Sequence, residues 1–134
     1  MELTLENSIA EISRLCDAIE LFCDQEQLSP RVRHDMLLVL DELVTNVITH
    51  GFSTGVGECV RVCLEKTEKG IYVAIIDDAP AFNPLAVKEP DVNASIEDRP
   101  IGGLGIHLMK QFSQHLAYQR KEEHNVLTFY LKAQ

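Results

Sequence analysis

Apolar and polar residues alternate along the chain with two different periods, and these periods predict its secondary structure. Residues 2–6 (ELTLE) alternate with period two, which predicts a short strand. Residues 9–22 repeat their apolar positions at helical spacing, and so do residues 30–50, so both segments are predicted helices. The signals that begin or end these helices are Asn7 or Ser8 before the first, Ser29-Pro30 at the start of the second, and Gly51 at its end.

The middle of the chain contains a predicted hairpin followed by a long irregular segment. Residues 58–66 (ECVRVCLEK) alternate as a half-buried strand, and residues 71–76 (IYVAII) form a more fully buried one. Lys69-Gly70 lies between them and predicts the turn. Residues 79–105 are rich in proline and glycine and show little periodicity beyond a turn near 84–88. A segment of this length inside a compact domain predicts a functional lid or a partly mobile segment.

The remaining residues complete a chain order of β-α-α-β-β-loop-α-β-β. A helix is predicted at 106–112, and strands at 116–120 and 125–132 form a second hairpin around Glu123-His124. This order predicts an α/β fold of the α+β type, a two-layer sandwich with helices on one face of a mostly antiparallel, mixed sheet. The length of 134 residues predicts a single domain, 1–134.

Charge and composition exclude several classes of function. The formal net charge of −9 argues against a protein that binds nucleic acid directly, because such a protein presents a basic surface to phosphates. The four cysteines form no CxxC pair, which favours buried, reduced thiols over zinc or disulfides. No apolar run reaches the roughly 18 residues of a membrane span, and the N-terminus lacks a signal-peptide core, so a cytoplasmic protein is expected.

Three polar side chains share one face of the second predicted helix. Glu42, Asn46 and His50 are spaced four residues apart, which places them in one slightly spiralling row. Glu42 is suited to accept a proton or orient a nucleophile. The amide oxygen of Asn46 is a neutral hard ligand for Mg²⁺ that is held mainly by phosphates and water. The alternative is a solvated polar stripe.

A second candidate site follows the buried strand 71–76. Asp77 stands at the end of this strand, directly before a turn of small residues and proline. A carboxylate fixed at a strand end accepts a hydrogen bond from an exocyclic amine, such as that of adenine, with little rearrangement. The alternative is an Asx turn, which aspartate and proline also favour.

A third candidate is the glycine-rich run before the last predicted helix. Gly102, Gly103 and Gly105 lead into the helix, where glycines permit a close backbone approach and the helix start offers free N–H donors to a phosphate. The spacing matches neither the P-loop pattern GxxxxGK[ST] nor GxGxxG after a strand. A flexible loop without a ligand is the alternative.

In this order, the three motifs resemble the nucleotide site of the GHKL ATPases, which include gyrase, the large heat-shock chaperone, histidine kinases and mismatch-repair proteins. Within that superfamily the chain most resembles the bacterial anti-sigma-factor serine/threonine kinases, and the resemblance covers nearly its whole length. The motifs are ELVTNVITHGF (42–52), DDAPAFNP (77–84), GGLGIHLMKQF (102–112) and the closing AYQRKEEHNVLTFYL (117–131).

The resemblance implies the Bergerat ATP-binding fold, with an ATP lid at about 83–105, and a role for each motif residue. Glu42 is the implied general base, Asn46 the Mg²⁺ ligand, and Asp77 the acceptor for the adenine amine. Ala79 replaces a glycine usual in the family; its methyl group is expected to narrow the adenine pocket or to exclude a positive φ. The other residues with implied or expected places are Gly102, Gly103 and Gly105 (lid amides that meet phosphates), His50 (packing or lid support), and Arg99 and Lys110 (surface residues flanking the lid).

The resemblance also implies a function and partners. The expected activity is transfer of the ATP γ-phosphoryl group to a small anti-anti-sigma (STAS-domain) protein, with Mg²⁺ as cofactor. A sigma factor or another regulatory target is the second expected partner, and a homodimer the expected assembly. The alternative is a non-catalytic binding module, nucleotide-responsive or nucleotide-free, that sequesters a regulatory partner. A structural α/β domain with a flexible loop would not explain why three ligand-type motifs occur in this order.

Overall fold

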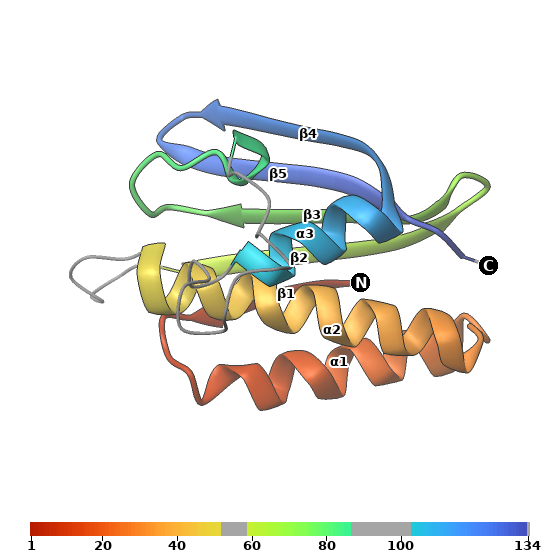
Figure 1. The fold of residues 1–134 in the computed structure, drawn as a ribbon. Coiled ribbons are helices and arrows are strands. Elements are labelled where there is room, and N and C mark those ends of the chain that lie inside the picture. The colour runs from red at the N-terminus through yellow and green to blue at the C-terminus, as the bar shows by residue number, and fades with distance from the viewer. Residues whose placement is uncertain (52–58, 87–102, 134) are drawn as a thin grey trace, which may run out of the picture.

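The computed structural model describes residues 1–51, 59–86 and 103–133 and has two layers. Three helices cover one face of a five-stranded sheet (Figure 1). In chain order the elements are β1 (Glu2–Glu6), α1 (Glu11–Gln25), α2 (Pro30–Asn46), a π-helical turn η1 (Val47–Gly51), β2 (Cys59–Thr67), β3 (Gly70–Asp77), a 3₁₀ turn η2 (Pro84–Ala86), α3 (Gly103–Phe112), β4 (Ser113–Lys121) and β5 (His124–Leu131).

The sheet has the strand order β1-β2-β3-β5-β4, and each of its four described pairings is antiparallel. The predicted two-layer fold is therefore confirmed, with a fully antiparallel sheet in the described part of the chain. Asp77, the last residue of β3, lies opposite Val60 on one side and opposite Asn125 on the other. This register places the first residues of β2 and β5 beside the end of β3.

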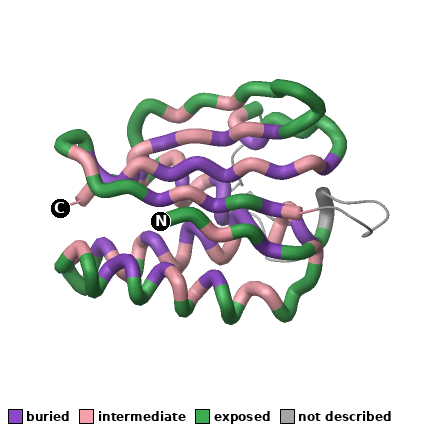
Figure 2. Tube along the Cα trace, turned by 180° about the vertical axis from the view of Figure 1, so that it is seen from behind, coloured by how far each residue is buried: buried purple, intermediate pink, exposed green. Residues whose placement is uncertain are grey.

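The core lies between the sheet and the helices. Buried positions alternate with half-buried ones along β5, and they recur along the helices that lie against the sheet (Figure 2). In β3 and β5 the odd-numbered residues face the helices. Asp77 and Asn125 belong to this inward-facing set, with only 6% of each residue exposed. Asp77 and Asn125 therefore place two polar side chains at the edge of a mostly apolar layer.

The helix signals in the sequence are confirmed in one case and wrong in another. The Ser29 side chain accepts a hydrogen bond from the Val32 N–H at 3.3 Å, so it caps α2 as predicted. Helix α1 begins at Glu11, and no side chain caps it. Ser8 instead accepts from the Ala10 N–H at 3.3 Å, so this serine stabilises the turn that precedes the helix.

The second predicted helix changes character before its end. Its α-helical part ends at Asn46, and η1 continues it to Gly51 with the wider i→i+5 pattern. The backbone of His50 lies in η1, but its side chain lies outside the described residues, so the third member of the predicted row stays a prediction. Glu42 and Asn46 remain one turn apart on α2.

The last helix begins earlier than the sequence pattern predicted. Helix α3 starts at Gly103 rather than at Ile106. Gly103 and Gly105, two of the three predicted lid glycines, therefore lie in the first turn of the helix and not in a loop. The third, Gly102, and most of the predicted lid lie outside the described residues. Because the first four N–H groups of a helix lack intrahelical acceptors, the amides of Gly103 and Gly105 can still face a ligand.

Candidate nucleotide and phosphoryl-transfer site

The carboxylate of Asp77 is held by two hydrogen bonds on one of its oxygens. Oδ1 accepts from the Ala79 N–H at 3.0 Å and from Nδ2 of Asn125 at 2.9 Å. No group in the described part of the chain donates to Oδ2. The bonds to Oδ1 therefore fix the side chain, and Oδ2 has the chemistry to accept a hydrogen bond from a ligand.

Burial raises the pKa of Asp77, because removal from water disfavours the charged form. The hydrogen bonds from Asn125 and from the Ala79 N–H act in the opposite direction and lower this pKa. The remaining influences are weaker: Asp78 raises the pKa and Arg120 lowers it. A buried acceptor with a defined orientation and a perturbed pKa is typical of a binding site.

Asn125 connects this carboxylate to the turn that follows it. Its Nδ2 also donates to the carbonyl oxygens of Pro80 at 3.0 Å and Ala79 at 3.3 Å. Its Oδ1 accepts from the Tyr118 hydroxyl at 2.6 Å and from the Phe82 N–H at 3.2 Å. One inward-facing side chain of β5 therefore holds most of the 79–82 turn.

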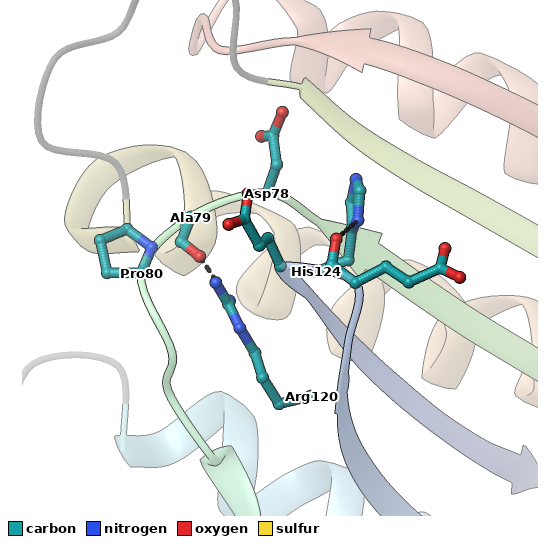
Figure 3. A pocket seen from close by; sticks show the side chains of 7 residues that line it. Asp78, Ala79, Pro80, Arg120 and His124 are labelled. Carbon is teal, nitrogen blue, oxygen red and sulfur yellow. Dashed lines mark hydrogen bonds between the residues drawn. The ribbon is translucent and has the colours of Figure 1, made fainter.

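Ala79 fits this turn without backbone strain. Ala79 is 2% exposed, and it is not among the non-glycine residues of the described chain that have a positive φ. A glycine is therefore not required for its conformation, and the expectation that the methyl group excludes a needed positive φ is wrong. The carbonyl oxygen of Ala79 also accepts from the Arg120 guanidinium at 2.8 Å (Figure 3).

An open polar depression lies on the Arg120 side of the same turn. Its volume is about 540 Å³, and Figure 3 shows the labelled side chains around it. Asp77 does not line it, so this depression is distinct from the place where Oδ2 would meet a ligand. Its lining residues are Asp78, Ala79, Pro80, Arg120, Glu122, Glu123 and His124.

Helices α2 and α3 make a very close contact at Glu42. A Cβ atom added to Gly105 would lie 2.5 Å from Cβ of Glu42 and 3.4 Å from its Cγ. Real Cβ atoms do not approach each other this closely, so only glycine fits here. The contact places the half-buried side chain of Glu42 beside the start of α3, where free N–H groups are available.

The other predicted residues have less definite places. Asn46 is the half-buried last residue of α2, and Lys110 lies half-buried in the last turn of α3. The side chain of His50 and all of Arg99 lie outside the described residues. Figure 1 shows the C-terminal ends of α2 and β3 toward the same end of the molecule, where α3 also begins. The fold thus brings the three predicted motifs toward one region.

The donor groups present fit a magnesium nucleotide better than a metal held by protein alone. The described residues contain no group of three or more His, Cys, Asp or Glu side chains able to hold a metal ion. Mg²⁺ in such a site depends on phosphate and water oxygens with few protein ligands, and the Asn46 amide would be a ligand of suitable chemistry. Oδ2 of Asp77 fits the amino group of a purine.

The cysteines take no part in this site. Cys16, Cys23, Cys59 and Cys63 are free thiols, of which Cys23 is buried and the others half-buried. Burial raises the pKa of each thiol, and the thiolate form is therefore disfavoured. The prediction of reduced thiols agrees with these positions, although only one thiol is fully buried.

No helix in the described ranges is long and apolar enough to cross a membrane.

Sequence comparison identifies the family. A family model of the histidine kinase-like ATPase domain matches residues 5–131. The chain belongs to this family. It is 31% identical over 104 residues to the serine/threonine-protein kinase BtrW of Bordetella bronchiseptica, covering 78% of this chain and 73% of that protein.

Other relatives belong to the same branch of the family. The chain is 26% identical to the serine-protein kinase RsbW of Bacillus mycoides, covering 69% of this chain and 60% of that protein. It is 28% identical to an anti-sigma F factor of Clostridium novyi, covering 72% and 69%. The predicted resemblance of this histidine kinase-like domain to anti-sigma-factor serine/threonine kinases is thereby confirmed.

Solved structures agree on the fold. The histidine kinase domain of the blue-light activated histidine kinase EL346 from Erythrobacter litoralis matches with a TM-score of 0.56 and 13% identity, covering 93% of this chain and 64% of that one. The histidine kinase AdeS of Acinetobacter baumannii gives a TM-score of 0.54 at 14% identity, covering 99% and 68%. At these identities the likeness establishes the shared fold alone.

Proposed function

We propose that this histidine kinase-like domain is an ATP-dependent protein serine/threonine kinase that acts as an anti-sigma factor or partner-switching regulator. Its proposed substrate is a serine or threonine hydroxyl of a small anti-anti-sigma partner of the STAS type. Its second proposed partner is a sigma factor or another regulatory target, and its proposed assembly is a homodimer. This assignment is supported by the similarity of the chain to proteins named as serine or serine/threonine kinases and as an anti-sigma factor.

The observation that carries the proposal is the contact between Glu42 and Gly105. It sets the Cβ and Cγ of Glu42 against the start of α3, and Glu42 lies one helical turn before Asn46 on α2. Phosphoryl transfer needs mainly positioning and neutralisation of charge. Backbone donors from Gly102, Gly103 and Gly105 are proposed to supply neutralisation together with bound Mg²⁺, for which Asn46 is the proposed ligand.

The proposed reaction uses Glu42 as the general base. The partner's hydroxyl oxygen forms a bond to the γ-phosphorus of ATP while the bond to the β–γ bridging oxygen breaks and ADP leaves. Glu42 orients this hydroxyl and accepts its proton. Asp77 binds the purine through Oδ2, and Ala79 is proposed to line the adenine pocket.

Incubation with γ-labelled ATP, Mg²⁺ and the cognate STAS-domain protein tests the activity. The partner is first identified by co-purification from the native cell and mass spectrometry. Label is expected to appear on a serine or threonine of the partner, and calorimetry is expected to show ATP binding in the presence of Mg²⁺. Binding without transfer would favour the alternative of a non-catalytic switch, and the absence of binding would remove the nucleotide from the proposal.

The substitution Asp77→Asn is expected to stabilise the fold and to weaken ATP binding. The amide keeps an oxygen for the Ala79 N–H and for Asn125 but removes the buried charge and presents an NH₂ group to the purine amine. Losing a hydrogen bond to a charged group costs about 1.5–3 kcal/mol, which is roughly tenfold or more in affinity. Calorimetry with ATP and thermal unfolding measure the two effects.

The pH dependence of this stabilisation follows from the raised pKa of Asp77 in the folded state. The folded protein then holds the proton more tightly than the unfolded chain, so the group stabilises the fold below the unfolded pKa. That stability is lost as pH rises through the folded pKa. The gain in Tm for Asp77→Asn is therefore expected at neutral pH and should shrink toward acidic pH; a gain that is independent of pH would contradict this account.

A further inference from the structure

The side-chain amide of Asn125 has only one orientation that satisfies its surroundings. Its NH₂ group faces three acceptors, namely Oδ1 of Asp77 and the carbonyl oxygens of Ala79 and Pro80. Its oxygen faces two donors, the Tyr118 hydroxyl and the Phe82 N–H. If the amide were flipped, its NH₂ group would face the two donors and its oxygen would face the three acceptors. The hydrogen-bond pattern therefore fixes the orientation of the amide.

This fixed amide determines which part of Asp77 remains for a ligand. Asn125 and the Ala79 N–H both donate to Oδ1, so rotation of the carboxylate about its terminal bond would break two hydrogen bonds. The two residues are direct neighbours in the antiparallel register, and each is only 6% exposed. A buried hydrogen bond of this kind is costly to leave unmade.

We propose that Asn125 is a positioning residue that aims Oδ2 of Asp77, an oxygen to which no described residue donates, and thereby sets the preference of the site for a 6-aminopurine over a 6-oxopurine. This inference rests on the proposed ATP site and assigns its base selectivity to a residue of β5. The amino group of adenine donates a hydrogen bond to Oδ2. A 6-oxopurine has a carbonyl oxygen at this position, which would face Oδ2 of Asp77 with no hydrogen atom available for a hydrogen bond. A site with a fixed acceptor therefore rejects the 6-oxo base.

Residues of β4, the neighbour of β5 on the side opposite β3, support Asn125 and the turn that it holds. The half-buried Tyr118 donates to Oδ1 of the asparagine, and Arg120 donates to the carbonyl oxygen of Ala79. Figure 3 shows Arg120 reaching Ala79 in this way. The orientation of the carboxylate from β3 is thus set by the β4–β5 hairpin, 41 to 48 residues later in the chain.

The test compares the affinities of the full chain for ATP and ITP, which differ at the 6-position of the purine, by calorimetry with Mg²⁺. Wild type is expected to prefer ATP by about tenfold or more, since ITP lacks the donor. Asn125→Asp replaces the NH₂ donor with an oxygen that repels Oδ1 of Asp77. The ATP/ITP ratio is expected to fall toward one, mainly through weaker ATP binding.

Two further variants and one control separate positioning from folding. Asn125→Ser introduces no charge and is too short to bridge Asp77 and Phe82, so it should also lower the ratio. Tyr118→Phe removes one of the two donors to the amide oxygen and leaves the Phe82 N–H, so it should lower the ratio by a smaller factor, less than about threefold. Thr128→Val, on the opposite face of β5, should leave it unchanged. Thermal unfolding identifies the variants that fold.

The possible outcomes are distinguishable. A folded Asn125 variant that keeps the wild-type ATP/ITP ratio overturns the positioning role, even if its overall affinity is reduced. A wild-type chain that binds ATP and ITP equally also overturns the role while leaving nucleotide binding intact. A wild-type chain that binds neither nucleotide overturns the proposed function, and this inference with it.

Discussion

Gly105→Ala is expected to separate α3 from α2 and to reduce phosphoryl transfer by roughly 100-fold. The added Cβ would lie 2.5 Å from Cβ of Glu42, whereas carbon atoms pack at about 3.5–4.0 Å. The helices must therefore move apart by about 1 Å. Misplacement of catalytic groups by this amount costs about 100-fold in rate even when the fold survives. ATP affinity is expected to fall as well, because the amides at the start of α3 move with the helix.

The effect of the same change on stability is expected to be smaller. Overpacking costs about 1–3 kcal/mol, while replacing glycine with alanine in a helix returns about 1 kcal/mol. A small decrease in Tm should therefore accompany the large loss of transfer. Gln111→Ala, an exposed change on the same helix, is the control and should leave both values near wild type.

Double variants test whether the contact itself is the cause. Glu42→Gly removes the Cβ that Gly105→Ala would strike, so adding it should restore ATP affinity and packing in part. Glu42→Ala keeps that Cβ and should not restore them. Transfer is not used as the readout here, because Glu42 is the proposed base. Equal behaviour of the two double variants would contradict the close approach of α2 and α3, as would a Gly105→Ala single variant with wild-type transfer.

The sequence predicted the fold well because its periodic signals agreed with one another. The alternation in residues 58–66 and 71–76 marked β2 and β3, and Ser29-Pro30 marked the start of α2. The polar residues that stand one helical turn apart, Glu42 and Asn46, were also readable as a pair. Local patterns of this kind depend on near neighbours in the chain, and tertiary contacts did not override them.

The sequence did not predict where the helices change or how close they come. Gly105 was interpreted as a lid glycine, but its position is a helix crossing that depends on Glu42, 63 residues earlier. The π-helical turn η1 likewise has no marker in the 3.6-residue period of the sequence, which predicted one regular helix through residue 50. Both features are set by packing between elements rather than by local propensity.

Asn125 was missed although the sequence contains a signal for it. In NVLTFYL every second residue faces the helices. Asn125 is the first of these inward-facing residues, and Leu127, Phe129 and Leu131 are the others. An amide at an inward position of a buried strand requires partners, so it marks a polar site. Which partners these are depends on the register that sets it opposite Asp77, and the sequence alone does not give that register.

Glu42→Gln is expected to reduce phosphoryl transfer by about 10²–10⁴-fold and to leave ATP affinity within about threefold of wild type. Glutamine has nearly the shape of glutamate and keeps the Cβ and Cγ that lie against Gly105, so the contact between α2 and α3 is preserved. Only the ability to accept the hydroxyl proton is lost. Transfer of label to the STAS-domain partner and calorimetry with ATP and Mg²⁺ measure the two quantities separately.

Asp41→Asn is the matched control for the lost charge. Asp41 is the neighbouring half-buried carboxylate of α2, and its Oδ1 accepts from the Thr45 hydroxyl at 3.0 Å, a bond that asparagine can keep. This variant changes the net charge equally but should transfer phosphate at the wild-type rate. If Glu42→Gln also transfers at that rate, Glu42 is not the base. If it instead loses ATP binding together with transfer, Glu42 acts in binding, and the proton must go to another acceptor.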